Sequence, residues 1–201
     1  SLIITAPSVK YRFLMKDGST IIIDNPALYP DPTKIAGTQE LYIRASMMMP
    51  GRYLGTVLKL CLQRRGTGTQ HRYLEGGRLE LTCELPLAEI VYDFHDRLKT
   101  VTQGYGSFDY ELLDYRESDL VRLDILINGE KVDALSQLVH RDRAPQRARY
   151  ACERLKDEIP RQQFRVIIQG AIGAKIIARE TLSPFRKDVT AKLYGGDVTR
   201  K

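Results

Sequence analysis

The spacing of apolar residues between positions 39 and 115 constrains the fold more than any other feature of the sequence. Leu41 to Met49 is an apolar stretch of strand length, and Pro50 with Gly51 ends it. From Tyr53 to Arg65 the spacing changes to three and four residues, which predicts an amphipathic helix. The apolar stripe of that helix consists of Leu54, Val57, Leu58, Cys61 and Leu62.

The same change of spacing repeats in the second half of this region. Residues 70–74 and 78–85 predict two strands joined across a Gly-Gly turn, and the second alternates apolar with polar residues. A helix is expected from Pro86 to just before Gly104, and a strand over 105–112. The order strand, helix, strand, strand, helix, strand is that of ferredoxin-like domains. We therefore expect an α+β fold in which two helices cover one side of an antiparallel sheet.

The first 38 residues predict a hairpin and a linker. Apolar residues alternate from Val9 to Phe13, Lys16-Asp17-Gly18 has turn composition, and Ile21–Ile23 forms the return strand. Because two strands alone are marginally stable, the hairpin in residues 1–24 is expected to complete another domain. Residues 25–38 contain three prolines within seven positions, which neither a helix nor a central strand accommodates, so we predict a linker.

Residues 118–201 predict a second α+β unit. An alternating strand over 121–127 leads into Asn128-Gly129, the strongest short signal for a hairpin. A basic stretch then precedes a helix that ends near Ile159, where Pro160 stops it. The remaining predicted elements are strands over 164–169 and 174–178, separated by glycines, and a short helix that opens at Ser183-Pro184 and ends near Leu193.

The positive charge of the chain is confined to its last third. Residues 141–201 contain 15 Lys/Arg and 7 Asp/Glu, a net charge of +8, whereas residues 1–140 carry −2. Ten of the 15 are arginines, whose planar, forked donors suit phosphates and stack on bases. This segregation predicts a nucleic-acid surface. An anionic membrane surface would attract the same residues, and a solvated face with scattered charges is the plainer alternative.

Composition and cysteine usage exclude several classes of protein. With 43% hydrophobic residues, the chain is not disordered, and no stretch approaches the roughly 20 apolar residues of a membrane-spanning helix. The first residues have no signal-peptide pattern, and they lack an initiator Met, so we expect a piece of a longer intracellular protein. Cys61, Cys83 and Cys152 are widely spaced, and we interpret them as small buried hydrophobes.

Motifs that carry catalysis are absent from the sequence. The string from Gly170 to Ile176 lacks the spacing and the hydroxyl of a phosphate-binding loop, so its glycines are predicted to turn the chain between strands. His140-Arg-Asp matches a kinase triplet without its accompanying motifs. An acyl-phosphate hydrolase would need an anion-binding loop before the first helix, where Pro50 removes an amide donor. We therefore predict no catalytic residue, metal site or cofactor site in this chain.

A resemblance to a known family rests on seven strings. They begin at Pro86 (PLAEIVYDF), Gly104 (GYGSFDYE), Val132 (VDALS), His140 (HRD), Ile159 (IPRQQF), Ala171 (AIGAKIIAR) and Tyr194 (YGGDVTRK). These strings closely resemble the translational GTPases of the LepA, or elongation factor 4, family over essentially the whole chain. The ferredoxin-like segment also resembles domain V of elongation factor G.

The resemblance implies a domain plan. Residues 1–24 would be the tail of domain III, 25–38 a linker, 39–117 domain V, and 118–201 the basic C-terminal domain special to LepA. A GTPase domain that binds GTP and Mg²⁺, a β-barrel domain and most of domain III would lie ahead of Ser1, and a basic tail beyond Lys201. None of the residues expected to bind GTP or Mg²⁺ would then lie in this chain.

The resemblance also implies a function and its partners. The parent would be a ribosome-dependent GTPase that promotes back-translocation or rescues stalled ribosomes, with a stand-alone RNA-binding or ribosome-assembly module as the alternative. The expected partners are RNA and proteins of the large ribosomal subunit, A-site tRNA and the anionic inner-membrane surface, and the chain is expected to be a cytoplasmic monomer. The residues expected to contact RNA are His140, Arg141, Arg143, Arg161, Lys175, Arg179, Arg186, Lys187, Lys192 and Arg200.

Overall fold

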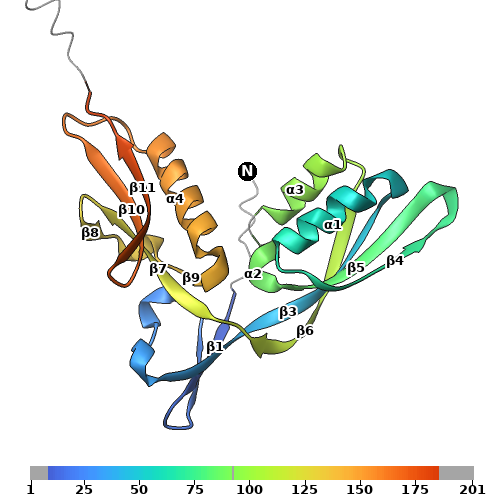
Figure 1. The fold of residues 1–201 in the computed structure, drawn as a ribbon, viewed down its shortest axis with the longest axis horizontal. Helices are drawn as coiled ribbons and strands as arrows, with labels where there is room; N and C mark the ends of the chain where they lie inside the picture. The colour runs from blue at the N-terminus through green and yellow to red at the C-terminus, as the bar shows by residue number, and fades with distance from the viewer. Residues whose placement is uncertain (1–8, 92, 186–201) are drawn as a thin grey trace, which may run out of the picture. The chain divides into compact units, whose positions relative to one another are not determined.

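The computed structural model describes residues 9–91 and 93–185, which divide into two units between Asp119 and Leu120 (Figure 1). The division falls two residues beyond the boundary at 117 expected from the sequence. Each unit contains an antiparallel sheet and at least one helix packed against it, and each is described by itself below.

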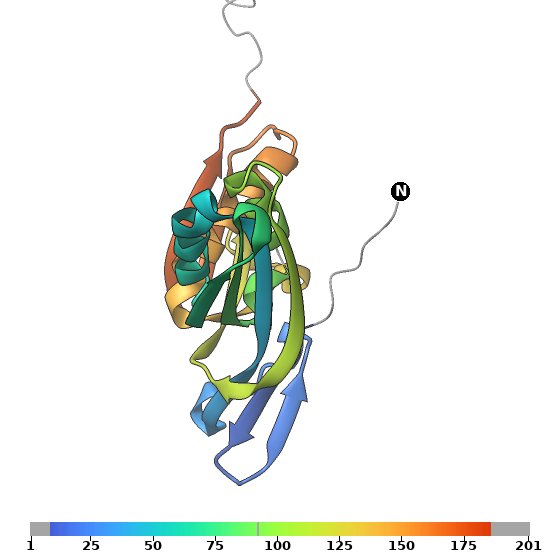
Figure 2. The ribbon, with the colours of Figure 1, turned by 90° about the vertical axis from the view of Figure 1, so that its right-hand side faces the viewer.

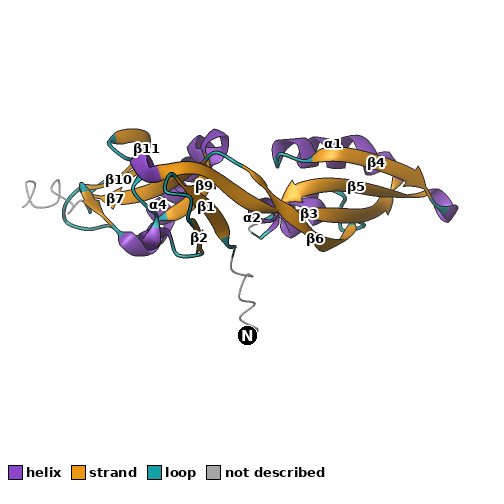
Figure 3. Cartoon of the chain, turned by 90° about the horizontal axis from the view of Figure 1, so that it is seen from below, coloured by secondary structure: helices purple, strands orange, loops and turns teal. Residues whose placement is uncertain are grey.

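The sheet of the first unit has the strand order predicted for a ferredoxin-like domain. Its elements are β1 (Tyr11–Met15), β2 (Thr20–Ile23), β3 (Ile35–Pro50), α1 (Leu54–Gln63), β4 (Thr67–Tyr73), β5 (Arg78–Pro86), α2 (Leu87–Ile90), α3 (Phe94–Val101) and β6 (Ser107–Glu117). Strands β6, β3, β5 and β4 lie side by side in that order, all antiparallel (Figure 3). The predicted fold class is therefore confirmed.

Strand β3 is much longer than the sequence pattern predicts, because it also pairs with the N-terminal hairpin. Its residues from Ile35 to Glu40 pair with β1, and those from Tyr42 to Pro50 pair with β5. Figure 2 shows β3 running from the blue hairpin to the helices. The structure thus differs from the predicted linker at positions 35–38, which are already strand. The last proline before β3 is Pro32, so every following residue up to Met49 has an amide that can join a ladder.

The rest of the predicted linker is a compact connection. Two one-turn 3-10 helices, Pro26–Leu28 and Pro32–Lys34, each begin with a proline. The side chains of Asn25 and Asp31 cap them by accepting from the backbone amides of Ala27 and Thr33 at 3.0 Å. The prolines therefore set turns here, as their fixed φ allows.

The second predicted helix of this unit is interrupted, so the expectation of one continuous helix is wrong. α2 ends at Ile90 and α3 begins at Phe94. In a continuous helix the Glu89 carbonyl would accept from the amide of Asp93. Here it accepts from the Arg64 guanidinium at 3.4 Å, and a second nitrogen of Arg64 pairs with the Asp93 carboxylate at 2.7 Å. A tertiary contact therefore replaces the helical one.

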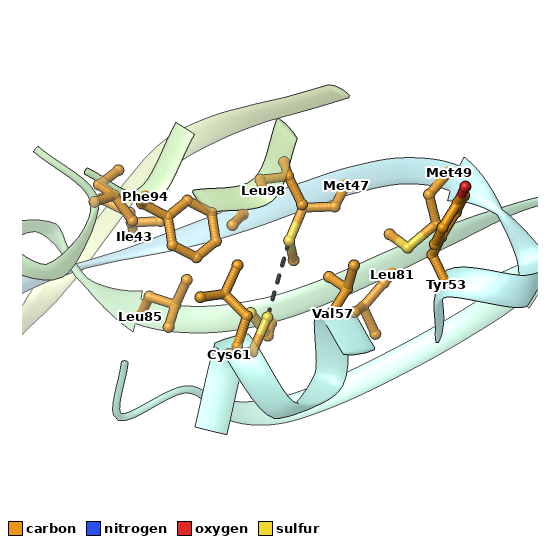
Figure 4. Close-up of a cluster of buried hydrophobic side chains, with 14 of the residues drawn as sticks. Ile43, Met47, Met49, Tyr53, Val57, Cys61, Leu81, Leu85, Phe94 and Leu98 are labelled. Atoms are coloured by element: carbon orange, nitrogen blue, oxygen red, sulfur yellow. Dashed lines mark hydrogen bonds between the residues drawn. The ribbon is translucent and has the colours of Figure 1, made fainter. Parts of the chain in front are cut away.

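The core of the first unit is built from large side chains between the sheet and its helices. Figure 4 shows Met47 of β3 above Cys61 of α1, whose Sγ lies 3.9 Å from the Met47 Sδ, with Phe94 and Leu98 of α3 alongside. All three cysteines of the chain are free and buried, which confirms their interpretation as core residues. Burial raises the pKa of Cys152 to about 11, so its reactive thiolate is suppressed at neutral pH.

Over its described residues, 120–185, the second unit is a five-stranded antiparallel sheet packed with one α-helix. Its elements are β7 (Leu120–Ile127), β8 (Glu130–Lys131), β9 (Gln137–His140), α4 (Ala144–Glu158), β10 (Val166–Ile172) and β11 (Lys175–Leu182). The strand order is β11, β10, β7, β8, and β9 also pairs with β7. Asn128 and Gly129 form the predicted turn between β7 and β8, both with positive φ.

The helix of the second unit packs very close to its sheet. The face of α4 that meets the sheet carries the small residues Ala144, Ala148 and Cys152. A Cβ added to Gly170 of β10 would lie 2.8 Å from the Ala148 Cβ, too close for any real contact. Gly170 was expected to turn the chain, and that expectation is wrong: it lies inside β10 and makes room for α4. Only Gly173, at φ 58°, turns the chain between β10 and β11.

Candidate nucleic-acid interface

The packing of α4 on β10 places the basic loops of the second unit at the two ends of α4. Ile172, at the end of β10, packs against the cluster that contains Ala144 and Ala148 near the start of α4. Val166, at the beginning of β10, packs with Cys152 and Leu155 further along the helix. The β10–β11 turn therefore lies at the end where α4 begins, as Figure 1 shows, and the loop after α4 lies at the other. A helix of 15 residues separates these ends by about 22 Å.

The end at which α4 begins, called here the first basic end, contains three of the predicted RNA contacts. Arg141 and Arg143 form a 3-10 turn (Arg141–Arg143) directly before α4, and Lys175 is exposed where β11 starts. The first turn of α4 carries no acidic residue. Since a helix N-terminus carries partial positive charge, basic residues here raise the local positive potential instead of neutralising it.

His140 has a structural role at this end. It is the last residue of β9, opposite Leu120 in the sheet, and its side chain is mostly buried. Its Nδ1 accepts a hydrogen bond from the Asp142 amide at 3.1 Å and so caps the 3-10 turn that precedes α4. The structure therefore gives His140 a local role in chain packing, while its predicted contact with RNA stays a prediction.

The other end, called here the second basic end, combines basic and aromatic side chains. The loop between α4 and β10 exposes Arg161 and Arg165. Phe164, between them in the chain, is 79% exposed, and Phe185 is 63% exposed. The amide of Phe185 donates to the Gln162 carbonyl at 2.6 Å, which joins the two segments. Arg165 was not predicted as a contact, although the basic composition of this segment already included it.

Of the remaining predicted residues, only Arg179 lies within the described ranges. Arg179 of β11 pairs with Gln169 of β10. Both of its neighbours in the chain face the helix: Ala178 packs toward α4, and Glu180 reaches Lys156 of α4 at 3.1 Å. By strand alternation Arg179 therefore lies on the face away from the helix. Arg186, Lys187, Lys192 and Arg200 lie outside the described residues, as does most of the helix predicted for 183–193.

The second unit keeps a surplus of positive charge after its ion pairs are counted. Residues 120–185 contain 12 Lys/Arg and 8 Asp/Glu. Arg122 and Lys131 share Asp124, Arg154 pairs with Glu158, and Lys156 pairs with Glu180. Within the described part of the second unit, no ion pair is found for five basic residues, namely Arg149, Arg161, Arg165, Lys175 and Arg179.

The open face of the first sheet is different, because its charges are compensated. Arg44 lies 2.9 Å from Glu111 and 3.7 Å from Glu84, and Arg116 lies 2.8 Å from Glu84. These hydrogen-bonded pairs lower the pKa of Glu84 and raise that of Arg116. The Arg116 guanidinium also covers the Tyr42 ring at 4.8 Å. This face therefore offers neither free positive charge nor an open aromatic surface for RNA.

No catalytic or metal centre emerges from the structure of residues 9–91 and 93–185. No group of His, Cys, Asp or Glu side chains in these ranges is arranged to hold a metal ion. Before α1, Pro50 is extended and pairs with Arg78, and no side chain caps the helix. No helix in these ranges is long and apolar enough to cross a membrane.

Comparisons with known proteins also divide the chain in two, seven residues after the division seen in the structure. Residues 38–126 match the family described as elongation factor G C-terminus, and residues 127–201 match GTP-binding protein LepA C-terminus. Over all 201 residues the chain is 63% identical to elongation factor 4 of Desulfosudis oleivorans. The chain belongs to the LepA, or elongation factor 4, family. The resemblance seen in the sequence is thereby confirmed.

Other relatives give the same relationship to the C-terminal part of LepA proteins. Elongation factor 4 of Syntrophus aciditrophicus is 63% identical and that of Treponema denticola 57% identical, each over 201 residues. The chain is fully covered in both comparisons, but it spans only about a third of the length of these relatives. The β6–β3–β5–β4 sheet and most of β7 thus lie in the region that matches elongation factor G C-terminus, and β8, β9, α4, β10 and β11 lie in the region that matches LepA C-terminus.

Proposed function

We propose that this chain is the ribosome-binding and tRNA-binding part of a translational GTPase of the LepA family, and that its second unit grips RNA phosphates. The observation that carries the proposal is the positive charge of Arg161 and Arg165 at one end of α4 and of Lys175 at the other, for which no ion pair is found in the described residues. Phosphates attract arginine and lysine at any sequence, so such a surface needs no base-specific readout.

The separation of the two basic ends favours a nucleic acid over a single small anion. The first basic end contains Arg141, Arg143 and Lys175, and the second contains Arg161 and Arg165, about 22 Å away along α4. One phosphate reaches only one of these ends, whereas an RNA backbone presents phosphates at both. The alternative is a scattered, solvated face, which would not bind RNA specifically and is tested by the experiment below.

The finer parts of the proposal come from the family. GTP hydrolysis with Mg²⁺ would belong to the part of the relatives that this chain does not cover. The first unit would dock on the large ribosomal subunit by shape and backbone contacts, and the second would reach A-site tRNA. The resulting activity would be back-translocation or rescue of stalled ribosomes in the cytoplasm. Attraction of the same basic surface to an anionic inner-membrane leaflet is the competing use of these charges.

The test is ribosome co-sedimentation of the full 201-residue chain over a salt series, with free tRNA as competitor. Each phosphate contact contributes about −0.7 to −0.9 to the slope of log affinity against log salt. We expect R161E/R165E to weaken binding and to make the slope shallower by about 1.4 to 1.8. The matched control is K59E/R97E, which reverses two exposed charges on the helices of the first unit.

Equal effects of the two variants would contradict a specific role for the second basic end. Binding that tRNA does not compete would contradict the tRNA part of the proposal. Binding to anionic vesicles that is stronger than binding to ribosomes would favour the membrane surface.

A further inference from the structure

Three loops of the first unit meet at one end of its sheet. They are the turn between β3 and α1 (Gly51–Tyr53), the turn between β4 and β5 (Glu75–Gly77), and residues 102–106 between α3 and β6. A Cβ added to Gly51 would lie 3.5 Å from the Tyr73 ring and 3.6 Å from the Gly77 carbonyl oxygen. The first two loops are therefore in contact, with the Tyr73 ring against the backbone next to Arg52.

Arg52 joins the third loop to this contact. Its guanidinium lies 4.7 Å from the centre of the Tyr53 ring and 5.6 Å from the centre of the Tyr105 ring. It also donates to the Tyr53 hydroxyl at 3.2 Å, and that hydroxyl donates to the Gln103 side chain at 3.1 Å. Gln103 has a φ of 52°, unusual for a residue other than glycine. Tyr53 is buried beside Met49 at this end of the core (Figure 4), so it anchors the arginine.

Two tyrosine rings remain open to solvent on this anchored group. Tyr73 is 70% exposed and Tyr105 is 57% exposed. His71 lies edge-on to the Tyr73 ring at 6.0 Å. We name Arg52, Tyr73 and Tyr105 the tyrosine platform. Two exposed aromatic rings held near a cation outside the core are typical of a binding surface.

We propose that the tyrosine platform stacks unpaired RNA bases, with Arg52 and Arg78 against the adjoining phosphates. The inference deepens the proposed function, since it assigns the first unit an RNA contact of a different kind. Stacking on aromatic side chains is how proteins hold single-stranded or looped nucleic acid, whereas bases in a duplex present no free faces.

The local charge favours a polyanion such as RNA over an apolar partner. Arg52 and Arg78 form no ion pair with any residue in the described ranges, and Arg72 is balanced by Glu80 at 3.0 Å. The one other acidic residue in these loops is Glu75, so the platform is locally basic although residues 1–119 carry 14 Lys/Arg and 15 Asp/Glu. A proline-rich or other apolar peptide would use the rings but not these cations.

The chain contains no tryptophan, which gives each ring its own reporter. Y73W and Y105W keep an aromatic surface and place a single fluorophore on the platform, while Y110W places one on β6, where Tyr110 is 40% exposed. On titration with a short oligouridylate, we expect the fluorescence of the first two variants to be quenched and that of Y110W to be unchanged. Duplex RNA at the same concentration should leave all three unchanged.

A second measurement separates this inference from the phosphate grip of the second unit. Y73A/Y105A should lower oligouridylate affinity roughly tenfold or more for each ring. Its salt slope should stay as in the native chain, because no phosphate contact is removed, and Y73F/Y105F should bind as the native chain does. R161E/R165E should instead reduce the salt slope of oligouridylate binding. When Y73W is combined with R161E/R165E, oligouridylate should still quench the fluorescence of the tryptophan.

Absence of quenching at Y73W and Y105W overturns the platform whether or not the second unit binds RNA. An unchanged affinity of a folded Y73A/Y105A variant, checked by circular dichroism, overturns it as well. Quenching with a salt slope that R161E/R165E leaves unchanged would instead contradict the function proposed for the second unit.

Discussion

The two units are both antiparallel sheets with helical cover, yet they differ in net charge. The first holds 14 Lys/Arg and 15 Asp/Glu, and arginines and glutamates alternate across its open face. The second holds 17 Lys/Arg and 10 Asp/Glu, with cations left over at both ends of α4. The number of arginines alone therefore does not identify an RNA surface: pairing decides which of them stay available.

The units also differ in how they fill their cores. The first packs large side chains such as Phe94, Met47 and Leu81 between its sheet and its helices. The second brings its helix close to the sheet through Ala144, Ala148 and Gly170. Large-to-small core substitutions should therefore destabilise the first unit most, and small-to-large substitutions should destabilise the second most.

The largest expected effect is that of Phe94→Ala. The Phe94 ring is fully buried and meets the Phe108 ring edge-on at 5.5 Å. Its loss should lower the free energy of unfolding of the first unit by about 3 to 5 kcal/mol. Urea unfolding, monitored by amide hydrogen exchange, will show which unit is destabilised. The amides of β10, in the second unit, should stay protected from exchange. Equal loss of protection in both units would break the comparison.

The next effect concerns the thiol beneath α4. With a pKa of about 11, Cys152 should react with iodoacetamide about a hundredfold more slowly than a free thiol near pH 8, because its thiolate is depleted. The folded state keeps the proton above pH 8.5 while the unfolded state loses it, so stability should fall as pH rises from there. Peptide mapping of alkylated protein measures the rate, and C152A should flatten the alkaline loss of stability. Rapid alkylation in the native state would show that α4 is not closely packed.

A smaller effect is expected when one methyl group is added between α4 and β10. Gly170→Ala should destabilise the second unit by about 1 to 3 kcal/mol, since its Cβ meets Ala148. G170A/A148G removes the opposing Cβ and should recover part of the loss, apart from about 1 kcal/mol for glycine inside a helix. Thermal melts of the four proteins form a double-mutant cycle. No coupling between the two positions would refute the close approach.

The smallest effect should come from the compensated face of the first unit. Glu84→Gln breaks the pairs with Arg116 and Arg44, which are partly exposed, so we expect a loss of only about 0.2 to 1 kcal/mol at neutral pH. The pKa of Glu84 is lowered in the folded state, so its stabilisation is present above about pH 4.3 and fades as pH falls through the folded-state pKa. The two proteins should therefore converge in acid. A constant difference at all pH values would point to packing instead of charge.

The elements that the sequence predicted best are those with local causes. Alternation and helical spacing predicted the strand order of the first unit, and Asn128-Gly129 predicted a hairpin that the structure contains. The break between α2 and α3 was missed because Arg64, far away in the chain, supplies the competing partner for Glu89. Gly170 was misread for a similar reason, since only the packed structure shows Ala148 opposite it.

The candidate interface was predictable in composition but not in arrangement. Charge counting identified the correct segment for a basic surplus, and Arg161 and Lys175 are exposed there. Charge counting did not assign any residue to a particular end of α4. That assignment depends on the antiparallel packing of β10 on α4, which only the structure shows. The tyrosine platform was missed, since Arg52, Tyr73 and Tyr105 are far apart in the chain and meet only through loop contacts.

The long strand β3 has a mechanical consequence. Its 16 residues span about 50 Å, and β1 and β5 hydrogen-bond to successive halves of the same edge. A pull on the hairpin is therefore transmitted through the β1–β3 hydrogen bonds into β3 and along it into the ferredoxin-like sheet, in addition to the covalent path through residues 24–34. Displacing the hairpin would require breaking the β1–β3 hydrogen bonds, so the hairpin and the ferredoxin-like sheet should respond to force as one mechanical unit.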